Sequence, residues 1–342
     1  MKRAVVICPG RGTYNKDELG YLTRHFPDKE LLSSFDEQRT QLGLEKLLDL
    51  DGADRFSMAK HTRGDNASAL IFAATLGDFM SINKNEVEIV AVTGNSMGWY
   101  SALACAGALA PNDGFKVANT MGYLMQQALI GGQLVYPHMN DDWHPDPARL
   151  KGLLDLVAEI ATRQGHILAP SIDLGGMLVI AGNEEGLSAF KKAVDVIQGR
   201  FPMRLGNHAA FHTSLQTPVA AEGRGMLSAD LFRQPTIPMI DGRGKIWWPD
   251  QETQQDLWDY TLNHQVVEMY DFTNAIRVAA REFAPDYFIV TGPGNTLGGA
   301  VAQSLILSNW QGLSCKDDFK TLQQQNGLLI SMGMAEQRKY VV

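Results

Sequence analysis

The chain has 342 residues, 45% of them hydrophobic and 20% charged, which is an ordinary globular composition for one large domain or two smaller ones. Its formal net charge of −8 argues against nucleic acid as the main partner, because a phosphate backbone requires a basic surface. The apolar run before Pro9-Gly10 is too short for a signal peptide or a membrane span, so we expect a cytoplasmic protein with no membrane partner.

The first part of the chain alternates strands with helices. Apolar, β-branched runs predict buried strands over 3–8 and 86–94. Apolar residues at helical spacing predict helices over 66–82, 97–109 and 113–129. This alternation indicates an α/β fold with a largely parallel sheet.

A different order of elements follows Gly131. We predict a strand within 131–139 and a helix within 146–165. Two strands follow within 166–182, then a helix within 183–197 and a last strand within 201–206. This β-α-β-β-α-β order is typical of a ferredoxin-like unit. We therefore predict a ferredoxin-like α+β subdomain at 131–206, inserted into a hydrolase-like α/β core formed by 1–130 and 207–342.

In its last third, the chain again alternates strands with helices. Residues 285–305 predict a strand, a Gly-rich turn and a helix. A dinucleotide-binding interpretation of this turn is weak, because it comes late and the first strand-to-helix turn lacks GxGxxG. The three cysteines, Cys8, Cys105 and Cys315, are too far apart for a CxxC or metal-binding motif.

The strand expected at 86–94 leads into a turn with one serine between two glycines. Gly94-x-Ser96-x-Gly98 fits a nucleophile elbow, in which a sharp strand-to-helix turn exposes the serine hydroxyl at a helix N-terminus. The glycines relieve crowding where strand and helix approach each other. A serine hydroxyl is a weak nucleophile and needs a base. Composition alone does not choose among the eight histidines, although His208 and His212 share one small-residue segment.

Five short segments stand in an order that resembles a known family. They are CPGRGT (8–13), GNSMGWYSALACAGAL (94–109), AAFHTSLQTP (209–218), NHQVVEMYDFTNAI (263–276) and VTGPGNTLGGAV (290–301). Together they resemble the malonyl-CoA:acyl-carrier-protein transacylases and the acyltransferase domains of polyketide synthases, over roughly residues 3–308. In that family, one segment carries a Gln or Asn that is followed seven positions later by an aromatic residue. Gln265 and Phe272 occupy these two positions here.

The resemblance implies a site and a reaction. Ser96 would be the acyl-accepting nucleophile and His212 its general base, with a main-chain carbonyl at Gln265 orienting the histidine. The backbone N–H groups of Arg11 and Met97 would form the oxyanion hole. The substrates would be a CoA thioester and the phosphopantetheine thiol of an acyl carrier protein, with no metal or redox cofactor required.

The chain departs from the family at four positions. Met121 stands where the family has an arginine that pairs with the carboxylate of malonate, and a thioether cannot form such a charge-assisted pair. Asn95, Trp99 and Arg11 replace the usual histidine, glutamate and glutamine. We expect the substrate pocket to be lined by Arg11, Asn95, Trp99, Met121 and Phe211.

Because of these departures, the sequence does not determine which acyl group the enzyme would accept. The interpretation that we favour is an uncharged acyl group in an apolar pocket formed by Met121 and Trp99. In the alternative, Arg11 supplies the missing positive charge from another wall of the pocket. A third interpretation is that Arg11 points to solvent and only its backbone matters.

Two other classes of protein compete with an acyltransferase. An α/β-hydrolase has the same elbow, but its histidine follows an acidic residue near the C-terminus, and here the last histidine is His264. An acyl-thioester hydrolase on the acyltransferase fold is harder to exclude, because the shape of the pocket decides whether water reaches the acyl-enzyme. A non-catalytic scaffold that binds acyl thioesters or a carrier protein is disfavoured by the presence of both Ser96 and His212.

Overall fold

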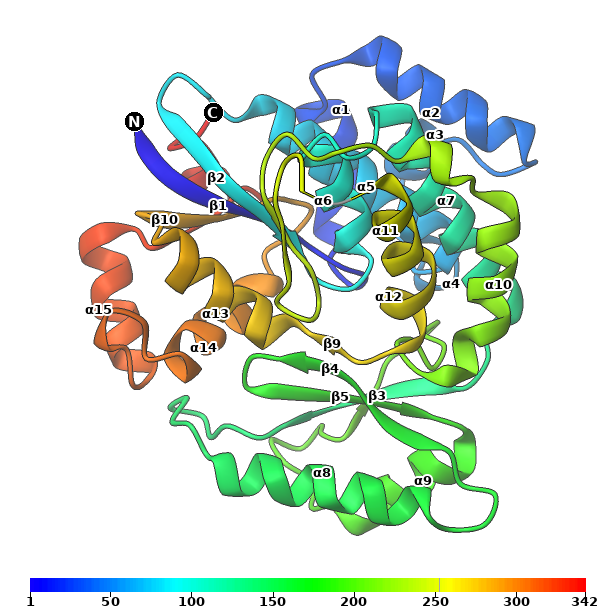
Figure 1. Cartoon of the computed structure of the whole chain (residues 1–342), viewed down its shortest axis with the longest axis vertical. Helices are drawn as coiled ribbons and strands as arrows, with labels where there is room; N and C mark the ends of the chain where they lie inside the picture. The colour runs from blue at the N-terminus through cyan, green and yellow to red at the C-terminus, as the bar shows by residue number, and fades with distance from the viewer. Residues whose placement is uncertain (252) are drawn as a thin grey trace.

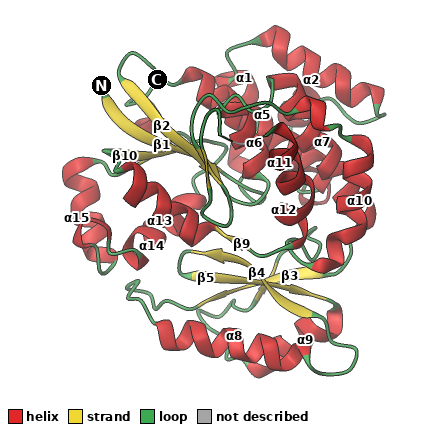
Figure 2. Cartoon of the chain, in the orientation of Figure 1, coloured by secondary structure: helices red, strands yellow, loops and turns green. Residues whose placement is uncertain are grey.

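The computed structural model describes residues 1–251 and 253–342 and contains two β-sheets (Figure 1). The larger sheet has the strand order β11-β10-β1-β2-β7-β8, and the smaller one has the order β6-β3-β5-β4-β9. Figure 2 shows the strands of the two sheets in yellow, with helices around the larger one and beneath the smaller one. This arrangement confirms the predicted fold class, a hydrolase-like α/β core with a ferredoxin-like subdomain.

The larger sheet is parallel except at one edge. Its strands are β1 (Lys2–Cys8), β2 (Val87–Gly94), β7 (Met239–Ile240), β8 (Ile246–Trp247), β10 (Tyr287–Val290) and β11 (Leu329–Ser331). Only β8 runs antiparallel to its neighbour. The central strand β1 is buried from Ala4 to Cys8, which explains its continuous apolar run. Because β1 and β2 end together at Cys8 and Gly94, the loops that follow them lie side by side.

Helices cover both faces of the larger sheet. One layer contains α5 (Gly64–Ser81), α6 (Gly98–Cys105) and α7 (Pro111–Ala128), and the other contains α13 (Phe272–Phe283) and α14 (Leu297–Leu307) (Figure 1). The remaining helices are α1 (Tyr21–His25), α2 (Lys29–Gln41), α3 (Leu47–Asp51), α4 (Met58–His61), α10 (Thr217–Met226), α11 (Gln254–Asp259), a π-helix (Tyr260–His264), α12 (Gln265–Val267), α15 (Lys316–Asn326) and α16 (Ala335–Arg338), with short 3₁₀ turns at Lys16–Glu18, Ser214–Gln216, Ala229–Leu231 and Trp310–Gly312.

The smaller sheet has the ferredoxin-like arrangement. Its strands β3 (Gly132–Pro137), β4 (Leu168–Leu174), β5 (Met177–Gly182) and β6 (Met203–Arg204) pair antiparallel, and α8 (Pro147–Ala161) and α9 (Glu184–Ala193) cover its outer face (Figure 1). A fifth strand, β9 (Tyr270–Asp271), comes from the C-terminal part of the chain and pairs in parallel with β4. The sheet therefore extends beyond the segment 131–206, and the boundaries of that insertion stay a prediction.

Most predicted elements are present, with ends shifted by a few residues, and two of them are shorter than expected. The helix expected over 97–109 ends at Cys105, because Gly107 adopts a positive φ of 80°. The strand expected over 201–206 is shorter in the structure, where β6 spans only Met203–Arg204. Pro202 precedes it and has no N–H group to donate to a neighbouring strand.

The C-terminal segment is built into the core by a buried polar cluster. Asp78 in α5 accepts hydrogen bonds from the Tyr21 hydroxyl (2.7 Å) and the Gly292 N–H (2.6 Å) and forms an ion pair with Arg338 of α16. The segment thus supports the Gly-rich loop that begins at Gly292. Within residues 1–251 and 253–342, no helix combines the length and the apolarity needed to cross a membrane.

Candidate active site

Ser96 lies at the strained turn between β2 and α6. Its backbone has a φ of 54°, in the left-handed region that side chains other than glycine rarely adopt. The flanking glycines are sterically required. A Cβ added to Gly98 would lie 2.2 Å from the Cys8 carbonyl oxygen, and one added to Gly94 would lie 2.3 Å from the Gly98 carbonyl. The turn thus has the geometry of a nucleophile elbow.

The close contact at Gly98 gives a stability prediction. We expect Gly98→Ala to destabilise the protein by about 1–3 kcal/mol or more, because the obstacle is main chain, which cannot rotate away. Chemical denaturation would measure the change. Gly152→Ala in α8 is the matched control, since an added Cβ there meets nothing within 4 Å and should be neutral or stabilising. Equal stability of the two variants would contradict this account of the elbow.

The Ser96 hydroxyl is paired with the His212 imidazole. Ser96 Oγ lies 2.7 Å from His212 Nε2, and His212 Nδ1 lies 2.7 Å from the main-chain carbonyl oxygen of Gln265. A carbonyl only accepts hydrogen bonds, so Nδ1 must carry the proton and donate it. This fixes the tautomer in which Nε2 is free to accept the serine proton. The predicted nucleophile, base and orienting residue therefore lie together.

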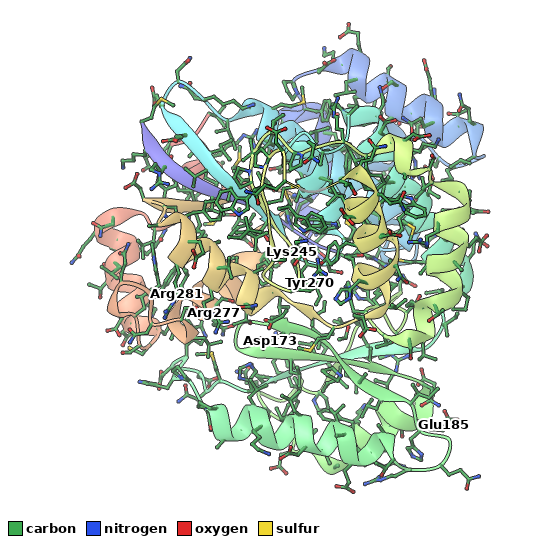
Figure 3. The ribbon with its side chains drawn as sticks, in the orientation of Figure 1. Asp173, Glu185, Lys245, Tyr270, Arg277 and Arg281 are labelled. Carbon is green, nitrogen blue, oxygen red and sulfur yellow. The ribbon has the colours of Figure 1, made fainter. Side chains whose placement is uncertain are left out.

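A second set of contacts holds the pair in place. The Gln265 side chain donates from Nε2 to the Ser96 carbonyl (3.0 Å) and accepts from the Tyr100 hydroxyl (3.2 Å). The Tyr270 hydroxyl donates to the Gly94 carbonyl (2.5 Å), and its ring centroid lies 5.4 Å from that of His212. Figure 3 shows Tyr270 where the core meets the smaller sheet. The sequence did not indicate Tyr100 or Tyr270, because their contacts depend on segments far apart in the chain.

Burial lowers the pKa of His212 to about 4, since the imidazolium loses solvation, and the hydrogen bond to Gln265 only partly offsets this effect. The imidazole is therefore the neutral base at all pH values well above 4. We expect kcat/KM for acyl transfer to be flat from about pH 8 to pH 5 with respect to this group, and to fall tenfold per unit below its pKa. A pH profile of kcat/KM would measure this. An acid limb near 6.5, the ordinary pKa of histidine, would contradict it.

The backbone donors expected for an oxyanion hole lie beside Ser96. Within the described residues, no protein group accepts a hydrogen bond from the N–H of Arg11 or of Met97. Both residues line a small cavity next to Ser96. Gly10 allows the loop after β1 to pack closely against the elbow, because a Cβ at this position would lie 2.5 Å from the Asn95 carbonyl oxygen. Two free N–H groups at this point suit a developing oxyanion.

The small cavity has a volume of about 20 Å³ and is largely apolar. Its lining comprises Arg11, Ser68, Ser96, Met97, Tyr100, Gly122, Met125, Phe211, His212, Gln265 and Val266. The prediction included Arg11 and Phe211 as pocket residues. It missed Ser68, Gly122 and Met125, although Met125 lies in the helix predicted over 113–129 and one turn beyond Met121.

Three residues expected in the pocket do not line this cavity. Trp99 is fully buried in the core, where its indole N–H donates to Thr261 Oγ1 (3.0 Å). Met121 is also fully buried and packs toward α10, with its sulfur 2.6 Å from the position of a Cβ on Gly223. Asn95 lies next to Gly10. In this structure the side chains of Met121 and Trp99 point into the core, and the residues that would hold the acyl group stay a prediction.

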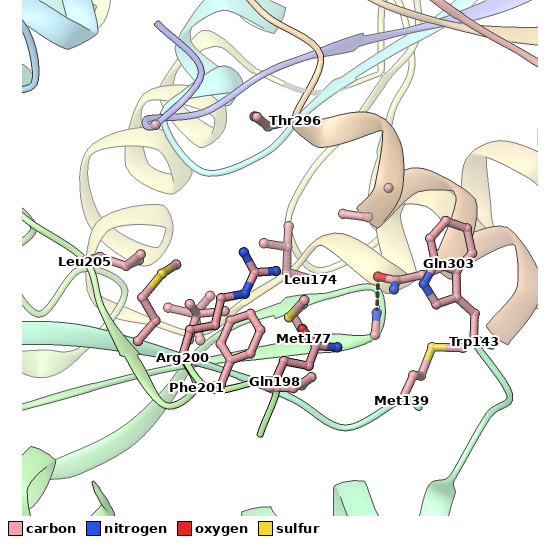
Figure 4. A pocket seen from close by; sticks show the side chains of 18 of the residues that line it. Met139, Trp143, Leu174, Met177, Gln198, Arg200, Phe201, Leu205, Thr296 and Gln303 are labelled. Carbon is pink, nitrogen blue, oxygen red and sulfur yellow. Dashed lines mark hydrogen bonds between the residues drawn. The ribbon is translucent and has the colours of Figure 1, made fainter. Parts of the chain in front are cut away.

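A much larger cleft, of about 770 Å³, lies between the core and the smaller sheet. Thr296 and Gln303 line it from the core side, and Met177, Arg200 and Leu205 are among the residues that line it from the other side (Figure 4). Arg11 lines both the cleft and the small cavity. Ser96 and His212 line the small cavity, and Arg11 separates this cavity from the large cleft.

His208, the other histidine of the segment, lines the large cleft and does not contact Ser96. Its Nδ1 lies 2.8 Å from Gln133 Oε1, and burial and the neighbouring Arg11 charge lower its pKa. No cluster of three or more His, Cys, Asp or Glu side chains suited to a metal ion is found in the described part of the chain.

A serine on a strained strand-to-helix turn, paired with a histidine that a main-chain carbonyl orients, is the arrangement expected of a nucleophile with its general base on an α/β core. The chain is similar to the malonyl-CoA:acyl-carrier-protein transacylase of Escherichia coli K12, with 25% identity over 214 residues. That match covers 61% of this chain and 63% of the E. coli protein. The transacylase of Bacillus subtilis is 22% identical over 302 residues, which cover 88% of this chain and 90% of that protein.

Solved structures show the same fold. The malonyl-CoA:acyl-carrier-protein transacylase of Xanthomonas oryzae superposes with a TM-score of 0.74 at 18% identity, covering 99% of this chain and 97% of that chain. A malonyl-transacylase solved with its type II polyketide synthase acyl-carrier protein gives a TM-score of 0.72 at 20% identity, covering 95% and 100%. No family model matches the chain. The resemblance indicated by the five motifs is confirmed in sequence and in fold.

Proposed function

We propose that the protein is an acyltransferase that moves an acyl group from CoA to the phosphopantetheine thiol of an acyl carrier protein through a seryl acyl-enzyme. The observation that carries this proposal is the 2.7 Å contact between Ser96 Oγ and His212 Nε2 in the small cavity, whose Arg11 wall also lines the large cleft. The names of the relatives, and the carrier protein bound to one of them, support the same reaction class.

The first half-reaction acylates the enzyme. Ser96 Oγ attacks the thioester carbonyl carbon while its proton passes to His212 Nε2. The carbonyl oxygen becomes an oxyanion, which the N–H groups of Arg11 and Met97 stabilise by about 3–4 kcal/mol per donor. The tetrahedral intermediate collapses, the C–S bond breaks, and the CoA sulfur takes the proton from His212.

The second half-reaction is the same chemistry with a different thiol. The carrier-protein thiol gives its proton to His212 Nε2, and its sulfur attacks the Ser96 ester. The C–O bond breaks, and Ser96 Oγ takes the proton back from His212. These steps use only the dyad and backbone donors, so the reaction needs no metal or redox cofactor.

The large cleft and the small cavity would bind different parts of the substrate. The cleft of about 770 Å³ suits the pantetheine arm of CoA or of a carrier protein, and Arg200 and Lys316 on its lining provide positive charge for phosphate groups. The small cavity, at about 20 Å³, has room for little more than one water molecule, so side chains must move for any acyl group to enter, and a short group requires the least movement. Met125 is a flexible wall that permits limited adjustment.

Incubation with a panel of acyl-CoAs, followed by intact-mass measurement after rapid quenching, tests the proposal. We expect a covalent adduct with short acyl donors and little with long ones. A wild-type protein whose mass stays unchanged with every donor would contradict an acyl-enzyme and favour a non-catalytic binding scaffold. An adduct that is discharged only to water would favour the acyl-thioester hydrolase.

A further inference from the structure

The segment that carries the Gln265 carbonyl determines where His212 lies. It is a π-helix (Tyr260–His264) that runs directly into the three residues of α12 and stops at Glu268, where the backbone becomes extended. The last carbonyls of this segment are therefore free to accept other donors. The Val266 carbonyl accepts the main-chain N–H of His212 (3.1 Å), and the Gln265 carbonyl accepts from its Nδ1 (2.7 Å). A shift of the segment would move the base with it.

Trp99 joins this segment to the helix that follows the nucleophile. It lies in the first turn of α6, three residues after Ser96, and its indole N–H donates to Thr261 Oγ1 over 3.0 Å. Trp99 and Thr261 are both fully buried. The indole ring also packs edge-on against the ring of Tyr260, with centroids 5.3 Å apart and an interplanar angle of 90°. Trp99 thus contacts two consecutive residues of the π-helix.

The Trp99 contact is the more sheltered of two links between α6 and the helical segment. Thr261 and Gln265 are four residues apart, so they lie on one face of the segment, and they contact the neighbouring residues Trp99 and Tyr100. Gln265 and Tyr100 line the small cavity, where a substrate can compete for their hydrogen bonds. Trp99 and Thr261 lie outside that lining, so their bond is unaffected by what enters the cavity.

The chemistry of this contact suits a fixed support. An indole has one N–H donor and no acceptor, and its large ring has only two side-chain torsions. Because both groups are shielded from water, breaking the bond leaves a buried polar group without a partner, which is unfavourable. This role also accounts for Trp99, which replaces the family's usual glutamate and does not line the cavity beside Ser96.

We propose that Trp99 is a positioning residue for the general base: its indole N–H holds the segment 260–267 against α6, so that Ser96 Oγ and His212 Nε2 stay in contact. The inference rests on the proposed function and adds a residue that touches neither the substrate nor the reacting atoms. The connection runs from Trp99 to Thr261, along the helical backbone to the Gln265 carbonyl, and from there to His212. A misplacement of about 1 Å in such a site can lower the rate roughly a hundredfold.

Single-turnover acylation of Trp99→Phe tests this assignment. Phenylalanine keeps an aromatic ring near Tyr260 and removes the N–H donor. We expect the rate at saturating acyl-CoA to fall by about tenfold to a hundredfold, with little change in the apparent affinity for acyl-CoA. Trp247→Phe is the matched control, because its ring centroid lies 5.8 Å from that of Tyr260 and its buried N–H donates to Asp241 (3.0 Å) instead of Thr261. This control should acylate at the wild-type rate.

A double-mutant cycle isolates the bond from other effects of the substitutions. Thr261→Val removes the acceptor with little change of shape, so it should slow acylation about as much as Trp99→Phe does. The double variant should be no slower than either single variant, because both remove the same bond. A wild-type rate in Trp99→Phe, or losses that multiply in the double variant, overturns the proposal.

A spectroscopic measurement tests the position of the base without acyl transfer. The proton on His212 Nδ1 should give a downfield NMR signal in wild type, assigned by its absence in His212→Ala, because the Gln265 carbonyl holds it in a buried hydrogen bond. Trp99→Phe should shift or broaden this signal, and Trp247→Phe should preserve it. A signal that Trp99→Phe leaves unchanged overturns the positioning role, even if the rate falls. The proposed acyl transfer is judged separately, since it fails only if no donor acylates wild type.

Discussion

Ser96→Ala is expected to abolish the acyl adduct and to lower the rate of acyl transfer by at least about three orders of magnitude. The variant removes the only oxygen that lies both at the strained elbow and 2.7 Å from the His212 base within the described chain. Backbone donors and the cleft would still bind the thioester, so affinity for CoA esters should persist. Intact mass after rapid quenching, followed by peptide mapping of the wild-type adduct, measures the effect.

Ser101→Ala provides the matched control for this prediction. Ser101 lies in α6, five residues after Ser96, and is fully buried, but it does not line the cavity. We expect this variant to form the adduct and to keep a folded structure. An adduct that persists in Ser96→Ala would place the nucleophile elsewhere and contradict the assignment.

His212→Ala should lower the acylation rate by about two to four orders of magnitude, the usual contribution of a general base. The reason is geometric, because His212 Nε2 contacts Ser96 Oγ and the Gln265 carbonyl fixes its tautomer. Stopped-flow or rapid-quench measurement of the first turnover isolates this step from carrier-protein binding. The seryl ester should still form slowly, since the nucleophile and the oxyanion donors are intact.

His208→Ala is the control for the base. His208 contacts Gln133 and lines the cleft, so its loss should affect the binding of the long substrate arm more than the first chemical step. If His208→Ala slowed acylation more than His212→Ala, the roles of the two histidines would have to be exchanged.

The nucleophile of the site could be predicted from local sequence, because the elbow depends on one short segment. Gly94, Ser96 and Gly98 fix a turn within five residues, and the strand and helix around them follow from apolar periodicity. His212 required the family resemblance, since no spacing rule links it to Ser96 across the chain. The structure then brings the two side chains into contact, which supports the role expected for each.

The pocket could not be predicted in the same way, because side-chain direction depends on tertiary packing. The family resemblance places Met121 at a substrate-binding position. In the structure its side chain points toward Gly223, and Met125 lines the cavity instead. Trp99 likewise points into the core, where Thr261 accepts its N–H. The Arg11 contacts with Thr62 and Asn207 join three distant loops, and no local pattern indicates such a contact.

The central claim is that Ser96 passes an acyl group from a CoA thioester to a carrier-protein thiol. Its most direct test starts from acyl-enzyme made with labelled acyl-CoA and freed of excess donor. Mixing it with a phosphopantetheinylated carrier protein, or with buffer alone, and measuring the label on each species over time compares transfer with hydrolysis. We predict rapid loss of label from Ser96 and its stoichiometric appearance on the carrier thiol, with slow release in buffer. Release of the free acid at the same rate with and without carrier protein would contradict the account and identify a hydrolase.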